Sequence, residues 1–312
     1  MSPKRQAWVL AGPTAAGKTD VAHALAEAMG GMVLCADAMT VYRGLDVGTA
    51  KPTPAQRSRV TYRGLDLVEP VAVFSAGAFV DEARRASDEA DAAGKPLIVV
   101  GGSGLYLSAI LRGLEPENTS DPVRRAHWEG VRAEGGVAAL QEALRARDAD
   151  AFAALADPMN PRRLIRALER LDAGRPAVRT WRADSIRPIC AIAVEPAVLK
   201  PRIAARARAM FDAGLLEEAA RLRASFPALS RTAAHAIGYA EAFAVLDQRM
   251  TREEAIAETT ARTWQLARRQ MTWFRRQLPV SWVSASESIA PDALADAVRR
   301  QWEHDGSSTL QL

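Results

Sequence analysis

The stretch Gly12-Pro-Thr-Ala-Ala-Gly-Lys-Thr19 decides the fold class of this 312-residue chain. It matches G-x-x-x-x-G-K-[S/T] at every fixed position, between a short apolar strand at 8–11 and an Ala-rich helical stretch at 20–29. Such a loop wraps phosphates with backbone N–H groups at a helix N-terminus, while its lysine neutralises oxygens and Thr19 can hold Mg²⁺. The motif predicts a phosphate site and does not by itself specify ATP.

The segments that follow extend this loop into a sheet. Gly30-Gly31 ends the helix, and the apolar strand 32–36 completes a βαβ unit whose right-handed crossover makes its strands parallel. A helix over 76–93 then leads into a third buried strand, 97–100. Alternating strands and helices predict an α/β fold with a P-loop NTPase-like parallel sheet core.

The pattern changes in the middle of the chain. From Val123 to about Arg182 it is helical with no convincing strand, and a strand returns at 189–194. We therefore predict a P-loop catalytic core made of residues 1–112 and 188–312, interrupted by an inserted all-helical domain at 113–187.

Composition limits the class of protein. There are 41 Lys plus Arg against 37 Asp plus Glu, so the net charge of +4 is compatible with a nucleic-acid partner but argues only weakly for one. Cys35 and Cys190 lie in apolar strand-like runs, as buried thiols of a reducing compartment do. Without a signal-peptide pattern or an apolar run of ~20 residues, we expect a cytoplasmic protein with no membrane partner. The last residues, 305–312, are expected to form a loose tail.

Two further strand ends are candidates for chemistry. Asp37 closes the second strand, so the parallel geometry places it at the same sheet edge as Lys18. An Asp that merely caps the next element is the alternative, but a neighbouring phosphate loop favours a base or a substrate anchor. The third strand ends in Gly101-Gly-Ser103 instead of the acidic residue common in motor ATPases. These small residues leave space for a flat group beside the Ser103 hydroxyl, and they also suit a tight turn.

Taken together, the motifs resemble those of the tRNA dimethylallyltransferase family, also called isopentenyl-diphosphate:tRNA transferases. The matching stretches follow the family's order and cover nearly the whole chain: GPTAAGKT (12–19), ADAMTVYRGLDVGTAKPT (36–53), GGSGLYLSAIL (101–111), DPVRR (121–125), PRRLIRALE (161–169), AIGYAEA (236–242) and QLARRQMTWFRRQ (265–277).

The resemblance implies a reaction and its catalytic residues. The enzyme would transfer the dimethylallyl group of dimethylallyl diphosphate to N6 of the adenosine 3′ of the anticodon, in tRNAs that read codons beginning with U. Asp37 would contact the exocyclic amine and act as general base, and Lys18 would stabilise the departing diphosphate. Ser103 stands where the family usually has a Thr that contacts the base.

The resemblance also implies a diphosphate site with Mg²⁺ as cofactor and Thr19 as its ligand. The residues assigned to the diphosphate are Gly12, Thr14, Ala15, Ala16, Gly17, Lys18, Thr19 and His235. His235 is a departure, because the family commonly has an Arg there, and a neutral imidazole binds anions less firmly than a guanidinium.

The tRNA anticodon stem-loop is the implied partner, gripped by the inserted domain. The residues assigned to tRNA are Asp37, Ala38, Met39, Thr40, Ser103, Arg125, Arg162, Arg163, Leu164, Ile165, Arg166, Arg268, Arg269 and Arg275. The stretch 262–276 supports this independently, since it carries five Arg and no acidic residue, as a basic ridge on an amphipathic helix would. A solvated Arg face is the alternative.

Two other functions remain open at this stage. A small-molecule kinase shares the phosphate loop and an acidic residue after the second strand, but it does not explain a basic helical insertion. A non-catalytic tRNA-binding relative, weakened at His235, would bind tRNA without chemistry. We expect a monomer.

Overall fold

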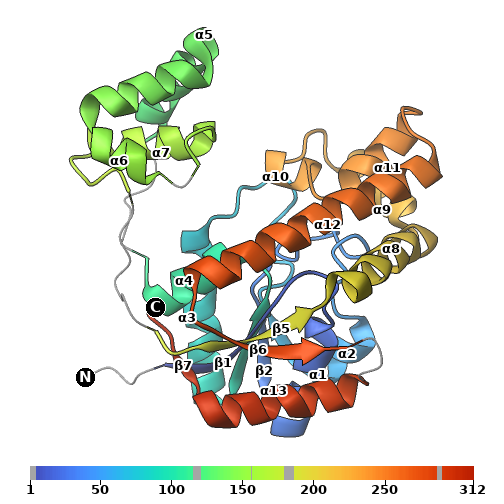
Figure 1. Cartoon of the computed structure of the whole chain (residues 1–312). Helices are drawn as coiled ribbons and strands as arrows, with labels where there is room; N and C mark the ends of the chain where they lie inside the picture. The colour runs from blue at the N-terminus through green and yellow to red at the C-terminus, as the bar shows by residue number, and fades with distance from the viewer. Residues whose placement is uncertain (1–4, 115–120, 156, 179–185, 287–289) are drawn as a thin grey trace. The chain divides into compact units, whose positions relative to one another are not determined.

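A computed structural model describes residues 5–114, 121–155, 157–178, 186–286 and 290–312. Contacts divide the chain into two compact units, one of Met1–Gly113 with Ala183–Leu312 and one of Leu114–Arg182. The larger unit contains the sheet and the smaller unit is helical (Figure 1). The proposed role of the helical unit in binding tRNA stays a prediction.

The described residues of the larger unit form a seven-stranded sheet in the order β3-β2-β4-β1-β5-β6, with β7 paired to β1. All pairings are parallel except the antiparallel pairing of β7 with β1. The predicted parallel P-loop core is confirmed. The strands are β1 (Gln6–Ala11), β2 (Met32–Cys35), β3 (Thr61–Arg63), β4 (Leu97–Gly101), β5 (Ile189–Val194), β6 (Val280–Ala285) and β7 (Ser308–Thr309).

Helices cover both faces of this sheet. The chain moves from β1 to β2 in one direction and from β3 back to β4 in the other, so right-handed crossovers place α1 (Lys18–Met29) and α3 (Ala76–Ala92) on opposite faces. α13 (Pro291–Asp305) packs on α1, and α4 (Gly104–Arg112) packs on α3. Because both faces are covered, β2 and β4 are buried along their whole length, as their continuous apolar runs require.

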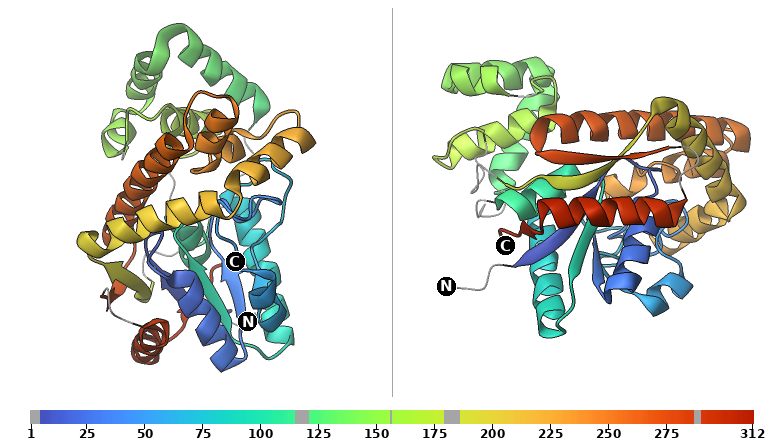
Figure 2. Two further views of the ribbon diagram at one scale, coloured as in Figure 1. Left: turned by 90° about the vertical axis from the view of Figure 1, so that its right-hand side faces the viewer. Right: turned by 60° about the horizontal axis from the view of Figure 1, so that its bottom comes forward.

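Most of the remaining helices of the larger unit pack in a group around α12, whereas α2 packs on β3. α12 packs along α8 and α11, as the views in Figure 2 also show. A capping box between Thr251 and Glu254 begins α12 by satisfying backbone N–H groups of its first turn. These helices are α2 (Pro54–Arg59), α8 (Pro196–Asp212), α9 (Leu215–Ser225), α10 (Arg231–Ala234), α11 (Tyr239–Leu246) and α12 (Arg252–Gln277).

The smaller unit contains α5 (Pro122–Arg147), α6 (Ala149–Ala154) and α7 (Pro161–Asp172). α5 is interrupted at Gly136, which has φ 67°. Its own core gathers apolar residues from α5 and α7, namely Trp128, Leu140, Leu144, Leu164, Ile165 and Leu168. A separate core of this kind makes the unit compact by itself.

The expectation of a loose C-terminal tail is wrong. β7 pairs with β1 through Gln6 and Thr309, and the N–H of Leu310 donates to the carbonyl of Arg5 at 2.9 Å. Leu310 is only 5% exposed. Its burial and the satisfied backbone groups hold the tail, a long-range pairing that a short polar run does not reveal. Across the described residues, no helix has the length and apolar character needed to cross a membrane.

Candidate active site at the carboxyl edge of the sheet

The phosphate loop joins β1 to α1, as its sequence predicts. Gly12 has φ 143°, and a Cβ there would lie 2.9 Å from the carbonyl oxygen of Ile192 on the neighbouring strand. Only glycine therefore fits at the start of the loop. The helix begins at Lys18, so the last residues of the motif lie at its positive N-terminal end.

A cavity of about 270 Å³ opens beside this loop within the larger unit. It brings together most residues assigned to the diphosphate and part of those assigned to the base. The predicted residues on its wall are Thr14, Ala15, Ala16, Gly17, Lys18, Thr19, Asp37 and Thr40. The phosphate loop and the candidate base therefore line the same cavity.

Lys18 is held inside this cavity. Its Nζ donates to the carbonyl oxygen of Pro13 at 2.6 Å. Burial lowers the pKa of the Lys18 ammonium to about 8, the nearby Asp37 carboxylate opposes that shift, and the Arg206 guanidinium adds to it. A desolvated cation of this kind gains most from an incoming anion.

The sequence analysis does not identify Arg206 and Gln270, which both line the cavity. Arg206 comes from α8, and burial lowers its pKa while Asp37 and Asp20 act against that shift. Gln270 comes from α12 and bonds to the phosphate loop and to Gly102. Both lie in amphipathic helices far along the chain, where one more Arg or Gln carries no local signal.

Asp37 and Ser103 lie at the ends of neighbouring strands. One carboxylate oxygen of Asp37 accepts from the N–H of Met39 at 2.8 Å, and its other oxygen has no hydrogen-bond partner among the described residues. Ser103 precedes α4, but its hydroxyl forms no capping hydrogen bond. Each residue therefore keeps a polar group available to a substrate.

The residues after Asp37 differ in exposure. Ala38 and Met39 are half-buried, whereas Thr40 is buried and donates its hydroxyl to the carbonyl of Gly64 at 3.3 Å. Thr40 thus supports the loop as well as lining the cavity.

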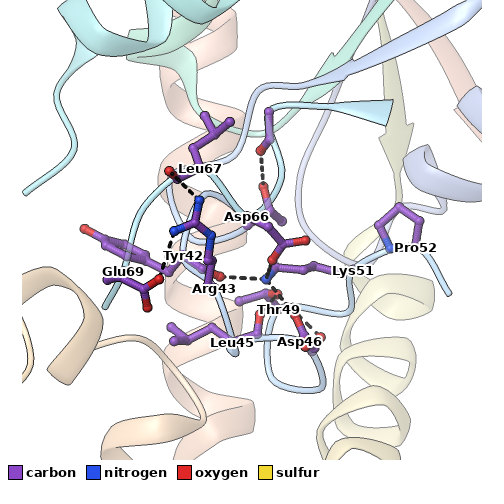
Figure 3. Close-up of polar contacts among 12 residues, drawn as sticks. Tyr42, Arg43, Leu45, Asp46, Thr49, Lys51, Pro52, Asp66, Leu67 and Glu69 are labelled. Carbon is purple, nitrogen blue, oxygen red and sulfur yellow. Dashed lines mark hydrogen bonds and ion pairs between the residues drawn. The ribbon is translucent and has the colours of Figure 1, made fainter. Parts of the chain in front are cut away.

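Beyond Thr40 the loop is anchored by a buried lysine, shown in Figure 3. Lys51 Nζ lies 2.6 Å from the carbonyl oxygen of Tyr42 and 2.6 Å from a carboxylate oxygen of both Asp46 and Asp66. Its side chain is 1% exposed. Because Lys51 and its neighbours Thr49, Ala50 and Pro52 also line the cavity, this cluster fixes one wall of the site.

His235 is not brought to the cavity. It is exposed at the end of α10, it is not among the cavity-lining residues, and its carbonyl oxygen accepts from Arg262. The prediction that its imidazole contacts the diphosphate has no geometric support, because the local turn directs the residue to solvent. Arg206 provides the second cation beside Lys18.

In the helical unit, the predicted tRNA residues separate into two groups. The side chains of Leu164 and Ile165 are buried in its core, so a contact of either residue with RNA stays a prediction. Arg162 and Arg163 are exposed on α7. Arg125 forms a two-pronged pair with Glu169, at 2.8 and 3.1 Å, and Arg166 contacts the same carboxylate.

On α12 the predicted arginines are solvent-facing. Arg268, Arg269 and Arg275 are exposed, and none has an acidic partner within the described part of the chain. Arg262 behaves differently, since it pairs with the buried Glu241. The basic ridge therefore occupies only the C-terminal half of the helix.

The chain is similar to known proteins along nearly its whole length. The model of the family described as IPP transferase matches residues 40–277. The tRNA dimethylallyltransferase of an Anaeromyxobacter species is 42% identical over 296 residues, which cover 93% of this chain and 96% of that relative. The enzyme of the same name from Streptomyces griseus is 41% identical over 278 residues, 87% of this chain and 88% of that one.

Comparison with solved structures gives the same result as comparison of the sequences. The crystal structure of a tRNA isopentenylpyrophosphate transferase from Bacillus halodurans superposes with a TM-score of 0.67 at 32% identity, covering 96% of this chain and all of that one. A eukaryotic dimethylallyltransferase described as acting on tRNA has a TM-score of 0.76 at 21% identity, covering 96% of this chain and 76% of that one, which shows the shared fold. With a matching family model and relatives above 40% identity, the chain belongs to the tRNA dimethylallyltransferase, or IPP transferase, family of prenyltransferases that act on tRNA.

Proposed function

We infer that this chain transfers a dimethylallyl group from dimethylallyl diphosphate to N6 of the adenosine 3′ of the anticodon, in tRNAs reading codons that begin with U. One observation carries the inference: a single cavity is lined by the phosphate loop, the cations Lys18 and Arg206, and Asp37. An anionic leaving group and an amine nucleophile can therefore meet there.

The phosphate loop binds the diphosphate of the prenyl donor. Its N–H groups lie at the N-terminus of α1, and Lys18 and Arg206 add two positive charges in a desolvated space. As the carbon–oxygen bond breaks, negative charge gathers on the departing diphosphate, where preorganised donors and cations stabilise it. Diphosphate is the leaving group and the allylic carbon is the electrophile, so the transfer requires no ATP.

At the amine end, Asp37 acts as general base. The exocyclic nitrogen of adenine is a poor nucleophile, so removal of its proton during attack and its orientation both matter. The free oxygen of Asp37 is available for that proton, and the uncapped Ser103 hydroxyl is available to the base. The new carbon–nitrogen bond forms as the proton passes to Asp37.

Mg²⁺ fits this site through the hydroxyl-bearing Thr19, which lies on the cavity wall. Mg²⁺ commonly binds one or two protein oxygens and completes its shell with water and substrate phosphates. This agrees with the finding that the described residues form no cluster of three or more acidic, His or Cys ligands. When bound, the ion would neutralise charge on the diphosphate.

For tRNA, the support is the distribution of arginines. Arg268, Arg269 and Arg275 on α12, and Arg162 and Arg163 on α7, are exposed cations suited to phosphates. The target adenosine must leave its stack to enter a cavity of this size, as bases modified by enzymes generally do. We propose that the helical unit grips the anticodon stem-loop during this step.

The test incubates the purified chain with Mg²⁺, dimethylallyl diphosphate and unmodified tRNA, without ATP, followed by mass spectrometry of the nucleosides. We expect one prenylated adenosine per tRNA, located 3′ of the anticodon. No product, with ATP consumed when a small acceptor is supplied, would support a kinase. Tight tRNA binding without either reaction would support a non-catalytic relative.

A further inference from the structure

Gln270 connects the two halves of the cavity with a single side chain. Its Oε1 accepts from the backbone N–H of Thr14 at 2.8 Å, and its Nε2 donates to the carbonyl oxygen of Gly102 at 3.1 Å. Thr14 lies in the phosphate loop, and Gly102 directly precedes Ser103. The amide therefore links the segment that faces the diphosphate to the segment that faces the base.

This link has little freedom to move. A Cβ on Gly102 would lie 2.3 Å from Nε2 of Gln270, and one on Gly104 would lie 2.2 Å from the ring of Trp273, about one turn further along α12. α12 thus rests directly on the turn that carries Ser103. The two hydrogen bonds of Gln270 use both polar groups of its amide, so a substituent lacking either group leaves a backbone partner unpaired.

We propose that Gln270 is a positioning residue that sets the distance between the phosphate loop and the base-side turn. The inference rests on the proposed function. Transfer requires the amine nitrogen to approach the allylic carbon in line with the breaking carbon–oxygen bond. A misplacement of ~1 Å can lower the rate roughly 10²-fold. Gln270 itself moves no proton and contacts no reacting atom.

A positioning role predicts that a Gln270 variant loses reaction rate but keeps its affinity for each substrate. In the proposed function the diphosphate is held by the loop, Lys18 and Arg206, and the base by Asp37, all of which line the cavity, and by Ser103, which follows the wall residue Gly102. None of these residues depends on Gln270 for its charge or hydroxyl. Each substrate alone should therefore bind a Gln270 variant nearly as well as the wild type. Only the reaction of the two together should suffer.

The first experiment measures single-turnover prenyl transfer by Gln270→Leu, with Mg²⁺ and both substrates saturating. We expect a rate about 10- to 100-fold below wild type, while the Kd values for Mg²⁺ with inorganic diphosphate and for tRNA stay within about threefold. Gln265→Leu is the matched control, because Gln265 is exposed on the same helix. It should react at the wild-type rate.

The second variant, Gln270→Glu, gives a signature that a merely structural role lacks. A protonated carboxyl has the shape of the amide, with a carbonyl to accept from Thr14 and an O–H to donate to Gly102. The ionised carboxylate cannot donate and places charge beside the diphosphate. The ratio of the variant's rate to the wild-type rate should therefore rise as pH falls, and Gln265→Glu should show a flat ratio.

The outcomes are distinguishable. If the wild type is active, three results would overturn the positioning role alone. Gln270→Leu could react as fast as the wild type, its affinities for diphosphate and tRNA could fall as far as its rate, or the rate ratio of Gln270→Glu to wild type could be independent of pH. A wild type that forms no prenylated adenosine overturns the proposed function and this inference with it. If Gln270→Leu unfolds, the pH ratio of Gln270→Glu decides.

Discussion

Ser103 donates its backbone N–H to the carbonyl oxygen of Ala36, the residue directly before Asp37, at 3.2 Å. Ala36 in turn donates its N–H to the carbonyl of Val100 at 2.7 Å. The ends of β2 and β4 are thus joined by backbone hydrogen bonds. The candidate base and the hydroxyl beside it are positioned by the sheet itself, which explains why small residues follow β4.

Gly101→Ala should destabilise the sheet. A Cβ at this residue would lie 2.1 Å from the carbonyl oxygen of Ala36, so a strand must shift to accept it. We expect a loss of about 1–3 kcal/mol in the free energy of unfolding, measured by urea denaturation. Gly130→Ala on α5 is the control, since nothing lies within 4 Å of its Cβ, and it should leave stability unchanged or raise it.

Asp37→Asn should remove the base and keep the shape. General bases contribute about 10²- to 10⁴-fold to rate, so kcat should fall by that order while the Kd for tRNA stays within about threefold. Rapid-quench transfer and filter binding measure the two quantities. An equal fall in affinity would instead assign Asp37 to tRNA binding.

Diphosphate affinity should depend on pH through Lys18. Since burial lowers the pKa of the free Lys18 ammonium to about 8, binding of an anion above that pH must take up a proton. Calorimetry should show the Kd for Mg²⁺ with diphosphate weakening by up to about tenfold per pH unit above pH 8. Lys18→Arg keeps its charge over this pH range, so its Kd should lack this dependence. The same pH profile in Lys18→Arg as in the wild type would contradict the assignment to Lys18.

As pH rises, the lowered pKa of Lys18 has opposite effects on binding and on stability: diphosphate binding weakens, whereas the free energy of unfolding increases. Because the pKa of Lys18 in the folded protein lies below its ordinary value of 10.5, the unfolded chain binds more protons between pH 8 and 10.5. The contribution of Lys18 to the free energy of unfolding should therefore increase with pH across that window. Comparing wild type with Lys18→Met isolates this contribution.

Lys51→Met should destabilise the cavity wall, because it leaves the carbonyl of Tyr42 unpaired and Asp46 and Asp66 without their shared cation. We expect a loss of about 2–4 kcal/mol in urea denaturation. The double variant Lys51→Met with Asp66→Asn should lose less than the two single variants summed. Strict additivity would show that the pair is not coupled.

Removing exposed arginines of α12 should weaken tRNA binding in a salt-dependent way. Each arginine–phosphate ion pair that a substitution removes should reduce the slope of log Kd against log salt by about 0.7–0.9. We expect this for Arg269→Ala, measured by filter binding across a salt series. Arg84→Ala on α3 is the control, since Arg84 already pairs with Asp81.

The parts of the site that the sequence predicts are those encoded locally. The phosphate loop needs glycine at a fixed position and a lysine at the helix start, and Asp37 ends a strand whose partner is known from the βαβ unit. Arg206 and Gln270 arrive from helices whose approach depends on packing between α8 and α12. No spacing within one segment reveals that approach.

Where the structure departs from the sequence expectation, the causes are of the same kind. The motif position of His235 predicts a contact with the diphosphate, which stays a prediction, while the turn after α10 leaves the residue exposed. Leu164 and Ile165 share a basic stretch with Arg162 and Arg163, yet helical periodicity turns them into the core. The expectation of a loose tail is wrong because a short polar run gives no sign of pairing with β1.

The antiparallel pairing of β7 with β1 has a topological consequence. Gln6 and Thr309 are partners in one ladder, so the first and last described strands of the larger unit are neighbours in space. A short peptide bridge would close the chain into a ring, and new ends opened at an exposed surface turn would yield a circularly permuted protein. In such a permutant the sheet would keep every strand neighbour it has now.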